Sequence, residues 1–227
     1  KNVILKTIAP GTCYMEVTSF AGSAQEMNKA FEQVKAKNPQ NLVIDLRKNQ
    51  GGGIEAGMAF AKHLMDTTTY GGLFLTRNYF REHDPLPPVD AYDQFPILQQ
   101  GNYDLLFQGI HKQKGICLKI KPVSNPYQGK VFILTGSRTA STCEPIVYGL
   151  KHANEATIVG ETTAGAMLSA EPFPMAAGYQ LYIPTATYYT VDGYKIDQNG
   201  VKPHHEVEST QALDYVKKHF MNPKEGQ

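Results

Sequence analysis

The amino-acid sequence predicts an α/β fold with a mixed, largely parallel sheet and flanking helices. Two continuous apolar runs of strand length, 41–46 and 130–134, are typical of strands buried on both faces of a parallel sheet. A glycine-rich or hydroxyl-rich turn follows each run, and a helical pattern follows each turn. The 227 residues suffice for one hydrophobic core, so we expect a single domain over residues 1–227.

The N-terminal quarter predicts a hairpin, a helix, a buried strand and a second helix. A Pro10-Gly11 turn separates two strand patterns. After Ser23, a candidate N-cap, apolar residues recur at spacings of three and four. We therefore expect strands at 2–8, 12–20 and 41–46, a helix at 24–37, and another from the Gly51-Gly52-Gly53 turn to about Met65.

Residues 81–123 show no sustained period and include the proline-rich run 84–88. We interpret this segment as an irregular insertion or lid with one short helix near 103–111. Long irregular segments in compact domains are often functional. The segment is therefore either a substrate contact or an inert excursion.

The remaining sequence returns to regular patterns, including a hairpin turn at Asp192-Gly193. We expect strands at 130–134, 156–159, 180–184 and 187–191, and helices at 141–153 and 209–220.

Composition excludes several classes of function. The 22 Lys and Arg balance 21 Asp and Glu, a net charge of +1, which disfavours nucleic acid and anionic membranes as partners. No apolar run is long enough to span a membrane, and no signal peptide is visible. The three cysteines show no zinc-ligand spacing and are interpreted as buried free thiols, with one disulfide plus one thiol as the alternative.

The chain begins with Lys1 rather than Met and enters the apolar run 3–5 almost at once. We expect an upstream segment to be missing, whether a leader, a pro-segment or a domain.

Two turns are candidates for chemistry, one at 49–53 and one at 137–142, because ligand sites form at the carboxyl ends of strands in α/β sheets. A hydroxyl at a helix start lies among unpaired backbone N–H groups, which stabilise an anion. An acyl-transfer site needs this arrangement. The alternative is structural: a plain helix cap and a tight glycine turn.

Four segments resemble, in order and spacing, the motifs of peptidase family S41, the tail-specific or C-terminal processing serine peptidases. They are DLRKNQGG at 45–52, TASTCE at 139–144, VGETTAG at 159–165 and GYKIDQNGVKP at 193–203, and the resemblance covers about residues 12–207.

The resemblance implies a ClpP/crotonase-like α/β fold with Ser141 as the catalytic serine. It also implies that backbone N–H groups of Gly51, Gly52 and Thr142 bind the oxyanion. Arg47 belongs to the first motif, and its structural alternative is a buried Arg paired with a carboxylate that fixes the loop.

At the position of the general base, this sequence differs from one branch of the family. A serine hydroxyl needs a base within hydrogen-bond reach, and the Ser-Lys branch places a lysine where this chain has Ala166. The branch with tricorn-core, nisin-resistance and retinoid-binding-protein-like members uses an upstream histidine. The resemblance thus implies a base outside residues 1–227, oriented by Asp197, unless Asp197 is only a turn residue.

None of the seven histidines matches the catalytic one. His63 and His152 are interpreted as surface or packing residues. Adjacent side chains of an extended segment point to opposite faces, so His204 and His205 favour solvent over a metal site. His83 and His111 fall in the irregular segment, where His111 would approach the serine only on closure of a lid. Cys143 is expected in the core.

These observations give one preferred function, a serine endopeptidase that hydrolyses polypeptides through an acyl-enzyme without a metal or organic cofactor. The resemblance implies a periplasmic or envelope location, and the sequence does not give the oligomeric state. We expect residues 1–227 to fold but to be nearly inactive alone.

Two rival functions use the same fold. A non-catalytic module would bind peptides or lipophilic ligands in the cleft; the missing base favours it and the intact Ser141 opposes it. A crotonase-type acyl-CoA enzyme would share the fold but not the motifs.

Overall fold

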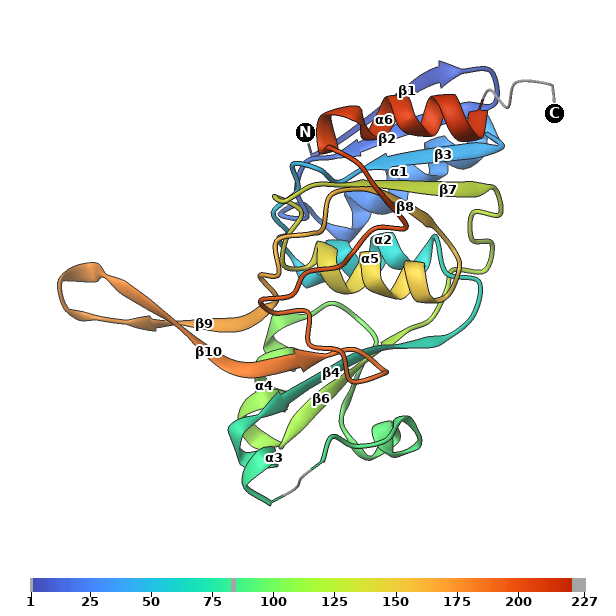
Figure 1. The fold of residues 1–227 in the computed structure, drawn as a ribbon. Coiled ribbons are helices and arrows are strands. Elements are labelled where there is room, and N and C mark those ends of the chain that lie inside the picture. Colours follow the sequence, from blue (N-terminus) through green and yellow to red (C-terminus); the bar gives the residue numbers. More distant parts are fainter. Residues whose placement is uncertain (1, 83–84, 222–227) are drawn as a thin grey trace.

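The computed structural model describes residues 2–82 and 85–221. They form a six-stranded sheet, a layer of helices and a five-stranded sheet, from which a long hairpin projects (Figure 1). The α/β fold expected from the sequence is confirmed.

The six-stranded sheet has the order β1-β2-β3-β7-β8-β11. Its strands are β1 (Val3–Ala9), β2 (Thr12–Val17), β3 (Asn41–Asp45), β7 (Lys130–Thr135), β8 (Thr157–Gly160) and β11 (His205–Glu206). Only β1 and β2 are antiparallel, because the Pro10-Gly11 turn joins them directly. The other neighbours are parallel, so β3 and β7 end at the same edge of the sheet. This edge carries both turns predicted to be functional.

Helices cover both faces of this sheet: α1 (Ala24–Lys37), α2 (Ile54–Lys62), α5 (Cys143–His152) and α6 (Ala212–Val216). Side chains alternate along a strand. Leu42 and Ile44 therefore pack with the apolar residues of α1, α2 and α5, whereas Val43 packs with α6. Each such buried aliphatic side chain stabilises the fold by about 1.5–3 kcal/mol. Ser23 caps α1 as predicted, since its hydroxyl accepts a hydrogen bond from Glu26 N at 3.3 Å.

The five-stranded sheet has the order β5-β6-β4-β10-β9. Its strands are β4 (Thr69–Thr76), β5 (Ile97–Leu98), β6 (Gly115–Ile120), β9 (Leu168–Pro174) and β10 (Gln180–Tyr189). It is mostly antiparallel, and the short helices α3 (Arg77–Glu82) and α4 (Tyr103–Lys112) accompany it. In Figure 1, α2 and α5 lie between the two sheets.

Several elements differ from the sequence-based expectations. Segment 81–123, expected to be irregular, contains the predicted helix as α4, and also β6 in the interior of the second sheet. The strands expected at 180–184 and 187–191 are one strand, β10, and its partner β9 was not predicted. The expected C-terminal helix is divided into a 3-10 turn, α6 and a π-helical turn over Lys217–Met221.

The three cysteines, Cys13, Cys117 and Cys143, are buried free thiols, as the sequence predicted. Burial raises the pKa of each thiol, in Cys117 to about 12. No helix within residues 2–82 and 85–221 has the length and apolar character that a membrane span requires.

Candidate active site

Ser141 lies in the turn between β7 and α5, with a left-handed backbone (φ 54°). This conformation is strained for any residue with a Cβ. The side chain is half-buried, and no described residue forms a hydrogen bond with its hydroxyl. The hydroxyl of Thr142 does not cap α5 either; it donates to the carbonyl of Gly52 at 2.7 Å. The alternative of a plain helix cap therefore fails for both hydroxyls.

Glu144, in the first turn of α5, fixes the backbone around Ser141. Its fully buried carboxylate accepts hydrogen bonds from the Ser141 N–H at 3.0 Å and the Thr163 hydroxyl at 2.6 Å. It also accepts from the N–H groups of Gly165 at 2.7 Å and Ala166 at 2.9 Å. One side chain thus joins two of the four sequence motifs.

The glycine turn after β3 packs directly against Ser141. A Cβ on Gly51 would lie 2.7 Å from the Cβ of Ser141 and 3.0 Å from the Thr142 nitrogen. Real Cβ atoms essentially never approach so closely, and the φ of 95° also favours glycine. The structure therefore brings together four of the predicted site residues, namely Gly51, Gly52, Ser141 and Thr142.

The three N–H groups predicted to bind the oxyanion differ in whether they already donate a hydrogen bond within the described structure. The Gly51 N–H donates to the Asn49 side-chain oxygen at 2.9 Å. The N–H groups of Gly52 and Thr142 have no hydrogen-bond acceptor within the described part of the chain. The Gly51 N–H shapes its turn, and the other two N–H groups remain free to bind an anion.

Asp197 lies in a loop beside the site rather than against the serine. It is buried, and within residues 2–82 and 85–221 its only ion-pair partner is Lys195, 3.8 Å away. No hydrogen bond joins it to Ser141 across those residues. Its loop is attached to the site through Gln198, whose N–H donates to the Gly165 carbonyl at 2.7 Å.

No described histidine forms a hydrogen bond or ion pair with Ser141. His111 pairs instead with Glu171 at 2.7 Å, and His63 is buried against Phe31 in a stacked arrangement. His204 accepts a hydrogen bond from Ile158 N at 3.0 Å. His83 lies outside the described residues, and the described residues contain no cluster of three or more metal-ligating side chains.

Arg47 forms an ion pair, as one of its two interpretations predicted. Its guanidinium binds both oxygens of Asp45, at 2.9 and 2.6 Å, and donates to the Ser209 carbonyl at 2.6 Å. Burial raises the pKa of Asp45, but hydrogen bonds from Arg47 and Tyr14 outweigh it and hold the pKa below its usual value. Arg47 therefore fixes the end of β3, from which the glycine turn departs.

A cavity of about 410 Å³ opens beside Ser141, between the helix layer and the second sheet. This is the size of a ligand pocket. Its walls are mainly apolar and come from α2, α4, α5 and the second sheet, including Ile54, Met58, Phe74, Leu106, Phe107, Leu118, Ile146, Met167 and Tyr188. One end is polar: Tyr148, Thr190 and His152 line it, and the first two donate hydrogen bonds to Asp192.

Sequence reasoning missed two parts of the site. Glu144 was visible in its motif, yet a carboxylate on a helix gives no sign that its partners lie in a distant loop. Tyr103, on α4, donates to the Gly52 carbonyl at 3.1 Å and lines the cavity with Leu106 and Phe107. Segment 81–123 therefore contributes to the site wall, a placement that no local pattern in the sequence revealed.

The comparisons with known proteins bear on the family and the fold of this chain. The profile of Peptidase family S41 matches residues 11–207. A carboxyl-terminal-processing protease of Picosynechococcus sp. is 24% identical over 205 residues, which cover 89% of this chain and 40% of that protein. The chain therefore spans well under half of that relative's length.

Two solved structures share the fold. The photosystem II D1 C-terminal processing protease matches with a TM-score of 0.64 and 20% identity, over 92% of this chain and 49% of the other. A lipoprotein from Streptococcus agalactiae matches with a TM-score of 0.68 and 15% identity, over 99% and 71%. Since the family profile covers most of the sequence and the fold agrees, the chain belongs to peptidase family S41.

Proposed function

We propose that the protein is a serine endopeptidase that cleaves polypeptides through an acyl-enzyme formed on Ser141. The observation that carries the proposal is the free hydroxyl of Ser141 on the wall of a cavity, next to two free backbone N–H groups. The hydroxyl oxygen attacks the scissile carbonyl, and its proton passes to a base. The N–H groups of Gly52 and Thr142 stabilise the oxyanion that develops. When the oxyanion collapses, the scissile C–N bond breaks and the amine leaves with the proton that the base returns to it. Water then attacks the ester carbonyl, gives a proton to the same base, and releases the carboxyl product and the Ser141 hydroxyl.

We propose that the base is a histidine from outside residues 1–227. No described side chain is hydrogen-bonded to the Ser141 hydroxyl, and Ala166 occupies the position of the lysine in the Ser-Lys branch. The buried carboxylate of Asp197, paired only with Lys195 in the described structure, is the candidate that orients this histidine. Vigorous peptide hydrolysis by residues 1–227 alone would contradict this part of the proposal.

Labelling with a fluorophosphonate tests the proposed nucleophile. We expect the full-length protein to react at Ser141 and the Ser141→Ala variant to lose the label. Ser137→Ala is a matched control, because Ser137 is an exposed serine in the same turn and should not affect labelling. Failure of the full-length protein to react would contradict the peptidase proposal.

The second candidate function is binding of a peptide or a lipophilic ligand without catalysis. The mainly apolar cavity of about 410 Å³ favours it. It predicts saturable binding of an apolar fluorescent probe together with no labelling of Ser141.

We also propose that the protein acts in the periplasm or cell envelope, as the resemblance to family S41 implies. Cell fractionation tests this location, and recovery of the protein in the cytoplasm alone would contradict it.

A further inference from the structure

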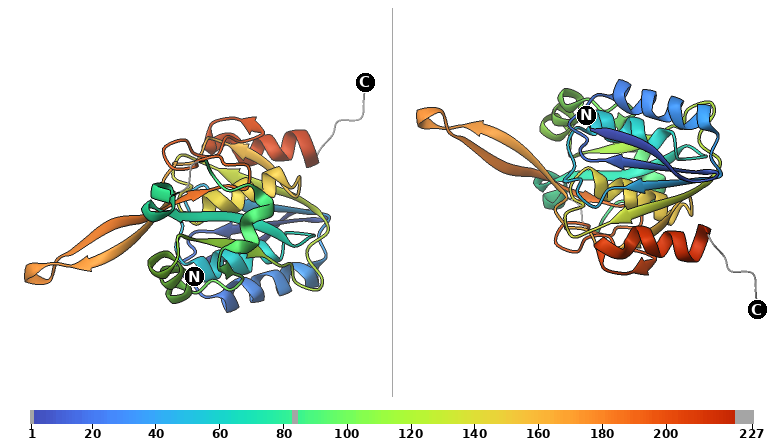
Figure 2. Two further views of the ribbon diagram at one scale, coloured as in Figure 1. Left: turned by 90° about the horizontal axis from the view of Figure 1, so that it is seen from below. Right: turned by 90° about the horizontal axis from the view of Figure 1, so that it is seen from above.

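The hairpin of β9 and β10 projects from the body of the protein as an arm, defined here as residues 171–184 (Figures 1 and 2). In β10, residues Ala186–Tyr189 pair with β4, whereas residues 180–184 pair only with β9. The arm is therefore a two-stranded ribbon, and such ribbons are at best marginally stable in water.

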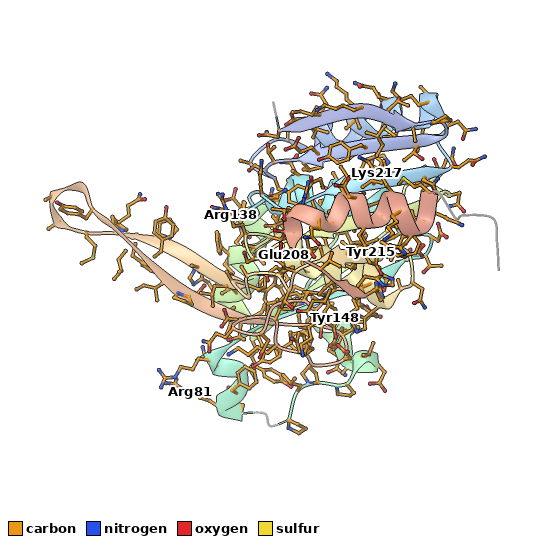
Figure 3. All side chains as sticks on the ribbon, turned by 45° about the horizontal axis from the view of Figure 1, so that its top comes forward. Arg81, Arg138, Tyr148, Glu208, Tyr215 and Lys217 are labelled. Carbon is orange, nitrogen blue, oxygen red and sulfur yellow. The ribbon has the colours of Figure 1, made fainter. Side chains whose placement is uncertain are left out.

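The arm exposes six large apolar side chains. The largest exposures are Tyr179 at 74% and Tyr182 at 63%, and the others are Phe173, Met175, Leu181 and Ile183. Figure 3 shows the side chains of the arm standing clear of the rest of the molecule. At the area of a large side chain, these six expose together roughly 500–800 Å². Phe173 lies opposite Leu181, and the N–H of Met175 donates to the carbonyl of Tyr179, so Phe173, Met175, Tyr179, Leu181 and Ile183 share one face of the ribbon and Tyr182 lies on the other. The five side chains of the shared face expose roughly 400–650 Å². Apolar patches of this size on soluble proteins mark interaction sites.

The prolines of the arm interrupt the outward-facing N–H groups along both of its edges. Pro172 and Pro174 lie opposite Tyr182 and Gln180, and Pro184 lies opposite Ala170. All three prolines thus occupy alternate positions, where an N–H would point away from the partner strand. Proline has no N–H, so neither edge offers a continuous row of donors to another strand. The outward-facing N–H groups of β10 that remain, those of Gln180 and Tyr182, form only a short run, so packing on the faces of the arm is favoured over strand pairing.

The charge of the arm limits the kinds of partner that can pack against it. Residues 168–189 contain no Lys or Arg, and the single carboxylate, Glu171, is engaged by Thr185 at 2.6 Å and by His111. A peripheral membrane surface would be expected to carry basic residues. The open edges of a two-stranded ribbon would also leave backbone groups unsatisfied in lipid. These features favour a protein surface, and an uncharged face can pack against its own copy without repulsion.

We propose that two copies of this chain associate through their arms, with the face that carries Phe173, Met175, Tyr179, Leu181 and Ile183 packed against the same face of the partner. The exposed area of this face supports this occupant, because with the backbone and smaller side chains around it the patch approaches the roughly 600–800 Å² per partner that a standard interface buries. A two-fold axis uses the same patch on both copies, so one self-complementary surface is enough.

The arm also links formation of the dimer to the cavity, because residues at its base line the cavity. Ala166 donates to Glu144, and Leu168, Ser169 and Ala170, at the base of the arm, line the cavity beside Ser141. A partner that holds the arm in place therefore fixes one wall of the cavity.

Sedimentation velocity of the full-length protein tests the proposal without measuring activity. We expect the parent to sediment as a dimer. The double variant Tyr179→Ser/Leu181→Ser, which removes two large apolar side chains from that face, should raise the Kd of the dimer on the order of 100-fold. Leu105→Ser is the matched control, since Leu105 is an exposed apolar residue outside the arm, and it should remain dimeric.

The proposal would be overturned if the unsubstituted protein were a monomer at every concentration, or if the double variant had the same dimer Kd as the unsubstituted protein. It would also be overturned if the unsubstituted protein were a monomer that floats with phosphatidylcholine vesicles. A Met175→Cys variant, with its thiol on the proposed contact face, keeps the proposal testable if the double variant fails to fold. A bismaleimide should link two copies at this exposed position, and failure to link them would contradict the proposal.

Discussion

The carboxylate of Glu144 accepts a hydrogen bond from the backbone N–H of Ser141, three residues before it, at 3.0 Å. The same carboxylate binds the loop at 163–166, so the turn of the candidate nucleophile and a distant loop share one acceptor. Because Ser141 has a left-handed backbone, this hydrogen bond helps to maintain a conformation that the residue would not adopt alone.

Replacing Glu144 by Gln should lower the free energy of unfolding by about 2–4 kcal/mol, because an NH₂ group would then face backbone N–H donors in the core. Urea denaturation measures the loss. Glu32→Gln, an exposed residue on α1, should change stability by less than about 0.5 kcal/mol. Equal effects of the two substitutions would contradict the anchoring role of Glu144.

The strain at Ser141 predicts an unusual order of stabilities. Ser141→Gly should unfold at higher urea concentration than Ser141→Ala, by about 1 kcal/mol, because glycine adopts a φ of 54° without penalty. Both variants should lack fluorophosphonate labelling. At Ser137, which has no positive φ, the order should reverse, and the same order at both positions would show that strain is not the cause.

The destabilisation caused by a steric contact at Gly51 can be measured separately from the destabilisation caused by its positive φ. Gly51→Ala should destabilise the protein and reduce labelling of Ser141, because the new Cβ would meet Ser141 at 2.7 Å. Gly178→Ala has a similar positive φ of 78° but nothing within 4 Å, so it measures the conformational cost alone. We expect Gly51→Ala to cost at least about 1 kcal/mol more in denaturation experiments. Equal costs would contradict direct contact between the two turns.

His63 predicts a loss of stability in acid. Burial lowers its pKa from 6.5 to about 4, so below pH 6.5 the unfolded chain binds a proton that the folded protein does not. The cost is absent above pH 6.5, grows as the pH falls, and levels off below pH 4 at about 3 kcal/mol. His63→Gln should flatten stability between these pH values, whereas the exposed His219→Gln should not. An unchanged slope for His63→Gln would contradict a buried neutral histidine.

The sequence predicted the elements whose signals are local. The runs at 41–46 and 130–134 and the spacing after Ser23 depend on neighbours within a turn or a strand, and β3, β7 and α1 appear where expected. β4 and β9 lack such signals. The Gly71-Gly72 pair interrupts β4, and Pro172 and Pro174 interrupt β9, so their strand structure depends on pairing with distant segments.

In the candidate site, too, local sequence signals predicted some features, and contacts between distant segments were not predicted. The motifs locate Ser141 and the glycine turn, because each motif is a short run of neighbouring residues that resembles the family pattern. The contacts of Tyr103 with Gly52, and of Glu144 with Gly165, join residues that are 51 and 21 positions apart, and these depend on the packing of whole elements. The catalytic base and the role of Asp197 stay predictions.

The three thiols described in the core make the fold independent of the redox state of its surroundings. Because Cys13, Cys117 and Cys143 are buried with raised pKa values, they react slowly with oxidants and alkylating reagents. The same structure can therefore form in an oxidising or a reducing compartment. A single cysteine introduced on the surface would also be the preferred site for a fluorescent label, without removal of the native thiols.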